Sequence, residues 1–193
     1  LWSPNVLERD RAADLLGIRA IVTPTTDPAA VLWGGASRSE QVSRREPASP
    51  RFGLYSRWRT AASETAAIEA VFAPTVDPRQ EVVIEADTYA AMAGAAAGGS
   101  PGTVTLISDS GARLRLRAES DEPCMLVVAD AWHRDWRATV NGRTAPVWRA
   151  NVLFRAIPLE AGTSEVVLSF FPTAVVYGLC TSLAAAVICL SMW

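Results

Sequence analysis

The chain contains no lysine and only one histidine. All 18 basic residues are arginine, a bias typical of GC-rich bacterial genomes that carries no weight for phosphate binding. His133 stands between Trp132 and Arg134, and no serine or cysteine nucleophile is paired with it in a recognisable motif. Nucleophile elbows, Walker loops, dinucleotide fingerprints and zinc-ligand spacings are also lacking. We therefore predict no catalytic residue, no cofactor and no metal site.

Cysteine and excess charge are scarce as well. Cys124, Cys180 and Cys189 have neither the spacing of metal ligands nor that of a disulfide framework, so we expect buried or lipid-facing thiols. The 18 basic and 20 acidic residues give a net charge of −2. Such a balance leaves no basic face, which excludes nucleic acid as a partner. The first residue is Leu1 rather than methionine, and we expect the chain to be part of a longer protein.

Charged residues disappear altogether after Glu165. The apolar run from Thr173 to Trp193 is long enough for a helix to cross the hydrocarbon core, which takes roughly 20 residues. Pro172 suits the first turn of a helix, where its missing N–H costs nothing. Aromatic residues near both ends of the run are typical of the two membrane interfaces. We predict a transmembrane helix over residues 172–193, the alternative being a buried C-terminal helix of a soluble protein.

The part before residue 100 is predicted to be a small N-terminal α/β subdomain with long loops. Ser63 is the expected N-cap of a helix that runs to Phe72. An Ala/Gly-rich linker over Ala90–Gly102 places the domain boundary near residue 100. The other expected elements are a helix over Glu8–Leu16 and strands over Ile18–Thr23, near Val31–Trp33, over Phe52–Trp58 and over Glu81–Glu85.

Residues 101–171 show regular alternation of apolar and polar residues. Their short strands predict an antiparallel, jelly-roll-like β-sandwich, so the fold class is α+β, mainly β. Asn141-Gly142 predicts a tight hairpin, and the arginines at positions 113, 115 and 117 are expected on a solvated face. The predicted strands cover 103–107, 112–117, 124–129, 136–140, 145–148, 152–157 and 165–170.

One cluster combines aromatic rings with carboxylate, amide and guanidinium groups. Sugar rings bind such surfaces through stacking and bidentate hydrogen bonds. The alternative is that the tryptophans fill the core and the polar residues shape turns. A further alternative, a hydrolase, would use Asp130 with Asp135 as paired carboxylates. The candidate substrate-binding residues are Asp130, Trp132, His133, Trp136, Trp148, Arg149, Asn151 and Arg155.

The same region resembles the C-terminal part of bacterial YfhO-like integral membrane proteins. The resemblance is carried by the string from Leu126 to Arg143, then by Ala145-Pro-Val, Arg149-Ala-Asn, Phe154-Arg-Ala-Ile and the apolar helix. Upstream, Asp14–Arg19, Pro50-Arg-Phe, Arg57-Trp and Asp77–Glu85 agree with it. Family members often carry tyrosine after the aromatic residue at position 132, where this chain has His133.

The resemblance implies a polytopic parent of the GT-C glycosyltransferase type, which takes a sugar from a polyprenyl-phosphate donor. This chain would be its extracytoplasmic C-terminal domain plus one late helix in the cell membrane. It would assist the binding of an acceptor glycan or glycolipid, and its partners would be membrane lipid, the parent's other helices and glycan or polyprenyl-linked sugar. The alternative is a non-catalytic structural or protein-interaction domain. Exposed Trp132 and Trp136 would favour the glycan reading, and buried ones the structural reading.

Overall fold

The computed structural model describes residues 20–26, 38–44, 49–85 and 102–191. Strands β1 (Ala20–Thr26) and β2 (Arg38–Arg44) pair as an antiparallel hairpin of their own. β1 overlaps the strand predicted over Ile18–Thr23. The helix expected over Glu8–Leu16, the strand expected near Val31–Trp33 and most of the Ala/Gly-rich linker lie outside the described residues.

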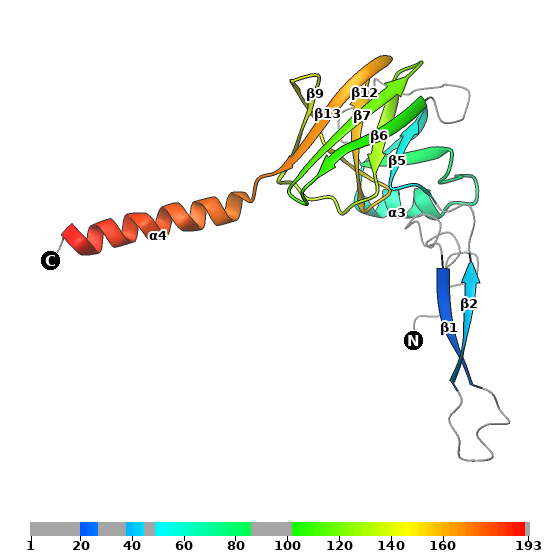
Figure 1. Cartoon of the computed structure of the whole chain (residues 1–193), viewed down its shortest axis with the longest axis horizontal. Coiled ribbons are helices and arrows are strands. Elements are labelled where there is room, and N and C mark those ends of the chain that lie inside the picture. The colour runs from blue at the N-terminus through cyan, green and yellow to red at the C-terminus, as the bar shows by residue number, and fades with distance from the viewer. Residues whose placement is uncertain (1–19, 27–37, 45–48, 86–101, 192–193) are drawn as a thin grey trace.

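Residues 49–85 and 102–171 form the β-domain, which has two layers. A five-stranded antiparallel sheet is one of these layers (Figure 1). Leu114 and Leu116 of β7 are buried while its arginines are exposed, as alternation predicted. Asn141 and Gly142 have φ values of 52° and 78°, and they join the strands over Trp136–Val140 and Arg143–Ala145 in the predicted hairpin. In spatial order the strands are β10 (Arg143–Ala145), β9 (Trp136–Val140), β13 (Gly162–Phe170), β7 (Arg113–Ser120) and β6 (Gly102–Asp109).

The second layer is a six-stranded sheet that mixes early and late segments of the chain. Helix α3 (Glu64–Phe72) connects two parallel strands of this sheet, and its N-cap Ser63 accepts a hydrogen bond from the backbone N–H of Ala66 at 3.2 Å. In order the strands are β3 (Phe52–Tyr55), β8 (Cys124–Val128), β12 (Phe154–Leu159), β11 (Trp148–Ala150), β5 (Glu81–Glu85) and β4 (Arg57–Ala61).

The second sheet closes on itself. β3 and β4 occupy its two opposite ends, yet only Ser56 separates them in sequence. Consecutive Cα atoms are about 3.8 Å apart, so the two ends of the sheet meet at this residue. The segment predicted as one strand over Phe52–Trp58 is therefore a bent strand that pairs with β8 before Ser56 and with β5 after it. The six strands make a small barrel.

Two apolar cores result from this closure. Leu126 of β8 faces the five-stranded sheet, where it packs with residues such as Leu116 and Leu168. Met125, its neighbour, points into the barrel, which is filled by residues including Trp58 and Phe154. Both faces of β8 are thus buried, which explains why all five of its residues are apolar or small. Helix α3 packs on the outside of the barrel, where its Ala67 and Val71 contact Val83 of β5.

The fold class is α+β, mainly β, as predicted. The division near residue 100 differs from the prediction, because residues 52–85 supply three strands to the sheet that also holds β8, β11 and β12. Residues 49–85 and 102–171 therefore share their cores. Hydrogen bonds between distant strands decide this, and no local pattern in the sequence encodes them.

Helix α4 (Thr173–Ser191) leaves the β-domain directly after β13 and extends away from it (Figure 1). It is long and apolar enough to cross a membrane, with a mean hydropathy of 2.0 and none of its residues buried by the rest of the chain. The predicted transmembrane segment thus appears as one isolated helix over the part of it that is described. Met192 and Trp193 lie outside the described residues.

Candidate functional site

A hollow of about 310 Å³ lies between the loop after β8, the start of α3 and strand β11. It brings together three of the predicted site residues, Trp132, Trp148 and Arg149. Ala61, Ala62, Ser63, Glu85 and Val147 complete its lining. The volume is at the lower end of the range for small-molecule sites. Upstream and downstream halves of the chain both contribute, because β5 pairs with β11.

Trp132 is fixed at the rim of this hollow. Its backbone N–H donates to the carbonyl of Leu153 at 2.7 Å, and its indole N–H donates to the carbonyl of Val147 at 3.2 Å. The guanidinium carbon of Arg149 lies 5.9 Å from the centre of its ring. The side chain is half-buried, so one part of the indole remains open to a ligand. Trp132 is therefore neither fully exposed, as glycan binding predicted, nor fully buried, as a purely structural role predicted.

The polar wall of the hollow is formed by Arg149 and Glu85. Arg149 Nη1 lies 3.0 Å from Glu64 Oε2 and 3.3 Å from Glu85 Oε2, and its Nε donates to the carbonyl of Val152. The hydrogen bond that Arg149 donates to Glu64 raises the pKa of Arg149, which keeps it a cation. Desolvation by burial raises the pKa of Glu85. Glu85 Oε1 is buried and has no hydrogen-bond partner among the described residues, so it is an acceptor that lacks a donor.

Asp130, Trp136 and Arg155 lie in a different place, where they tie the two sheets together. Arg155 Nη2 is 2.9 Å from Asp130 Oδ2, and its guanidinium carbon lies 4.0 Å from the centre of the Trp136 ring. Only 3% of Arg155 is exposed. Burial lowers the pKa of its guanidinium, against the attraction of Asp130. The Arg155 side chain is thus engaged in internal contacts with Asp130 and Trp136.

Arg51 completes this ionic network. Its Nε and Nη2 donate to the two carboxylate oxygens of Asp130, each at 2.9 Å, and Nη2 also lies 3.0 Å from Asp109 Oδ2. The hydrogen bond to Asp130 raises the pKa of Arg51. Asp109 belongs to β6 in one sheet, and Asp130 follows β8 in the other. The network therefore bridges the two layers at the end from which α4 leaves.

Asn151 and His133, the last two predicted residues, have separate positions. Asn151 is buried at a φ of 45°, and its Oδ1 accepts a hydrogen bond from the backbone N–H of Val83 at 2.9 Å. It thereby continues the pairing of β11 with β5 and has a structural role. His133 is exposed, and its Nδ1 accepts from the backbone N–H of Asp135 at 3.1 Å. The lining residues of the hollow that the sequence did not indicate include Glu85 and Ser63, and Arg51 and Asp109 of the ionic network were not indicated either.

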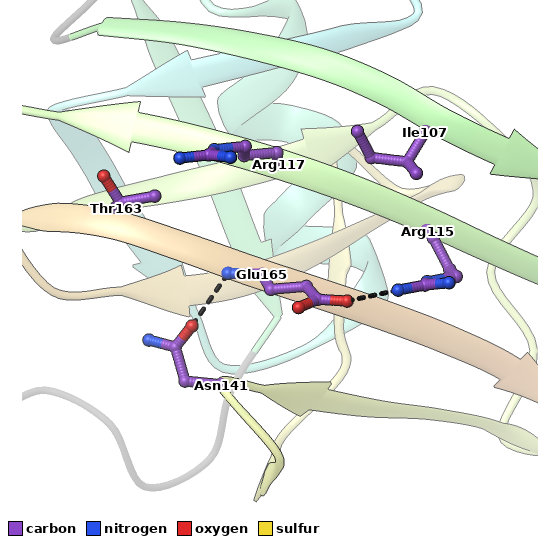
Figure 2. Close-up of a pocket in the computed structure, with 6 residues that line it drawn as sticks. All are labelled: Ile107, Arg115, Arg117, Asn141, Thr163 and Glu165. Carbon is purple, nitrogen blue, oxygen red and sulfur yellow. Dashed lines mark hydrogen bonds and ion pairs between the residues drawn. The ribbon is translucent and has the colours of Figure 1, made fainter.

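A second hollow, of about 400 Å³, lies on the outer face of the five-stranded sheet (Figure 2). In Figure 2, Arg115 and Glu165 point toward one another, with Nη2 and Oε1 2.6 Å apart, and Asn141 Oδ1 accepts from the backbone N–H of Glu165 at 2.8 Å. The charged side chains of this hollow are about half exposed and are paired, Arg115 with Glu165 and Arg117 with Glu119. It offers neither an aromatic ring nor a buried polar group, so the hollow at Trp132 is the better candidate.

Comparisons with known proteins add no relative. No protein-family model, no curated protein and no solved structure matches the chain.

Proposed function

We propose that this chain is the extracytoplasmic, non-catalytic accessory domain of a multi-pass membrane protein of the YfhO-like, GT-C glycosyltransferase type. In this proposal α4 packs among the other membrane helices of the parent, and the β-domain holds an acceptor glycan or glycolipid in the hollow at Trp132. The observation that carries the proposal is the pairing of a half-open tryptophan with the buried, donor-free oxygen of Glu85.

The chemistry of the hollow supports a sugar more than an apolar ligand. Sugar rings present a C–H face that packs on indole and hydroxyl groups that donate to carboxylates. Glu85 lines the hollow, and a rotation of its carboxylate that turns Oε1 toward the hollow would let a ligand hydroxyl donate to an acceptor that is now buried without a donor. Arg149 is held by Glu64 and Glu85, so its remaining N–H groups are oriented before a ligand arrives.

The site is also held at a fixed distance from the membrane helix. Trp132 lies in the loop that leads to Trp136, the first residue of β9, and Trp136 packs against Phe170, the last residue of β13, with ring centres 5.3 Å apart. Only Phe171 and Pro172 separate β13 from α4. A lipid-linked glycan at the bilayer surface would therefore meet a rigidly placed hollow.

The test is a calorimetric titration of the full chain in nanodiscs with cell-wall oligosaccharides. We expect Glu85→Gln to weaken binding about tenfold or more, because a hydrogen bond to a charged group contributes roughly 1.5–3 kcal/mol. Glu165→Gln is the matched control, since it makes the same change in the second hollow and should leave binding unaltered. Absence of heat at millimolar oligosaccharide would refute glycan binding.

The second candidate is a structural or protein-interaction domain. It is favoured by the internal contacts of Arg155, Asn151 and Trp136, which were predicted as ligand contacts and instead hold strands together. On this reading the titration is silent for the wild-type chain. A substitution that unfolds the β-domain would then lower the stability of the parent protein, and the affinity of the parent for glycan would stay the same.

A further inference from the structure

The end of the β-domain nearest α4 is formed by two segments, the turn over residues 109–113 and the loop over residues 130–137. We call it the helix-proximal end. The backbone N–H of Phe170 donates to the carbonyl of Ala112 at 2.8 Å, and that of Phe171 donates to the carbonyl of Asp135 at 3.0 Å. Both segments are therefore fixed against the residues that immediately precede α4. Wherever α4 enters a bilayer, the helix-proximal end lies at its surface.

This end is basic although the chain as a whole is acidic. The two segments themselves carry three arginines and three aspartates; with Arg51 and Arg155, which pair with two of these aspartates, the cluster has a net charge of +2, whereas the whole chain has −2. The charged residues concerned are Arg51, Arg113, Arg134, Arg137, Arg155, Asp109, Asp130 and Asp135.

The excess charge is carried by three exposed arginines. Asp109 and Asp130 are neutralised by Arg51 and Arg155, as described above. The Asp135 carboxylate accepts hydrogen bonds from Thr173. Within the described ranges, no ion pair is found for Arg113, Arg134 and Arg137, and all three are exposed.

Each of the three lies close to the start of α4. Arg113 and Arg137 are the register partners of Ser169 on the two sides of β13. The guanidinium carbon of Arg137 lies 4.8 Å from the centre of the Phe171 ring, and Phe171 is 43% exposed. Arg134 is the neighbour in sequence of Asp135, whose carboxylate accepts hydrogen bonds from Thr173 at the start of α4. An exposed aromatic ring among arginines suits the boundary between headgroups and acyl chains.

We propose that Arg113, Arg134 and Arg137 bind the phosphate groups of anionic phospholipids at the surface of the membrane that α4 enters. Arginine forms bidentate hydrogen bonds with phosphate, and basic residues beside a membrane helix are attracted to anionic headgroups. The contact orients the β-domain on the bilayer. It requires α4 to enter the membrane, and it does not require the glycan site.

Two other arginines of β7, Arg115 and Arg117, differ from Arg113 because each forms an ion pair. Arg115 pairs with Glu165 and Arg117 with Glu119, at 2.6 and 3.4 Å. They lie further along β7 from the helix, opposite Val167 and Glu165. Among the described residues of β7, the arginine without an ion pair thus lies at the end nearest α4, and the arginines with ion pairs lie away from it.

The experiment counts lipids that stay bound to the full chain. The chain is reconstituted in bilayers of equal parts phosphatidylglycerol and phosphatidylcholine, extracted gently, and analysed by native mass spectrometry. We expect phosphatidylglycerol to be retained in preference to phosphatidylcholine. Since each arginine near an anionic surface contributes roughly fivefold, Arg134→Gln with Arg137→Gln should lower this preference about tenfold or more.

The matched control is Arg57→Gln with Arg143→Gln. These arginines are also exposed and have no ion pair among the described residues, but they belong to β4 and β10, away from α4. The proposal is overturned if the wild-type chain shows no preference, or if the control pair abolishes it equally. Circular dichroism confirms folding of each variant, and Arg113→Gln with Arg134→Gln replaces the first pair if Arg137 proves necessary for folding.

Discussion

The carboxylate of Asp135 caps the first turn of α4 by binding Thr173 twice. Asp135 Oδ1 accepts from the Thr173 hydroxyl at 2.7 Å, and Oδ2 accepts from its backbone N–H at 3.2 Å. The Thr173 hydrogen bonds lower the pKa of Asp135, so the carboxylate is charged where the helix dipole favours a negative group. A residue of the β-domain thus satisfies a helix donor that would otherwise be unpaired.

Replacing Asp135 by alanine should loosen the junction between β13 and α4. The Thr173 N–H loses its acceptor, so we expect faster hydrogen exchange of the amides in the first turn of α4, measured by mass spectrometry of the full chain in nanodiscs. Asp135→Asn keeps one oxygen acceptor, so its exchange rate should lie between those of the wild-type chain and Asp135→Ala. Asp121→Ala removes an exposed carboxylate from the β7–β8 turn and should change nothing. Equal exchange in all variants would refute the cap.

Arg155→Ala should destabilise the β-domain by about 1.5–3 kcal/mol, because it removes a hydrogen bond between charged groups while Asp130 keeps its two hydrogen bonds from Arg51. Removal of the side chain also takes away the group that covers one face of Trp136. The measurement is denaturant unfolding of the full chain followed by tryptophan fluorescence. Arg143→Ala removes an exposed arginine and should stay within about 0.5 kcal/mol of wild type. A similarly small effect of Arg155→Ala would contradict a buried structural ion pair.

Trp58→Ala tests whether the barrel interior is a true core. Trp58 is 8% exposed and packs with Val82 and Met125 inside the closed sheet. Emptying this position should cost about 3–5 kcal/mol of unfolding free energy. Leu153→Ala, at a side chain that is 51% exposed, should cost far less. If the two costs were alike, the β3–β4 strand would not close the sheet.

The stability of the domain should fall as pH rises above 4.5 because of Glu85. Burial raises the pKa of this carboxyl above the 4.5 of an unperturbed glutamate, so the folded chain holds the proton more firmly than the unfolded chain. Its stabilising contribution is complete below 4.5 and is lost as pH rises through the folded pKa. Glu85→Gln should flatten the curve of unfolding free energy against pH in this interval. Glu165→Gln should leave this part of the curve intact.

Local features of the fold were predictable because they depend on neighbours in the chain. The Ser63 cap, the Asn141-Gly142 turn, the alternation along β7 and the apolar helix all appear where the sequence placed them. Each depends on dihedral preferences or on side-chain periodicity over a few residues. The mainly β fold class follows from the same patterns.

The candidate site was predicted only in part. Trp132, Trp148 and Arg149 do meet in one hollow, but Glu85 joins them through pairing of β5 with β11, which no local signal reveals. Conversely, Asp130 and Arg155 are close in space but serve a network completed by Arg51 and Asp109, far upstream and across the sandwich. A polar cluster in sequence therefore did not distinguish ligand contacts from internal ion pairs.

The sequence by itself determined helix α3, most of the strands from Phe52 onward and that the last helix is apolar enough for a membrane, but it did not indicate β2 or the division of 145–148 between β10 and β11. The tertiary structure alone decided that β3 and β4 close a barrel, that residues on both sides of position 100 share cores, and that Asp135 caps α4. The physical reason is that these features depend on hydrogen bonds and packing between residues far apart in the chain. Their free energy arises only when the whole domain has folded.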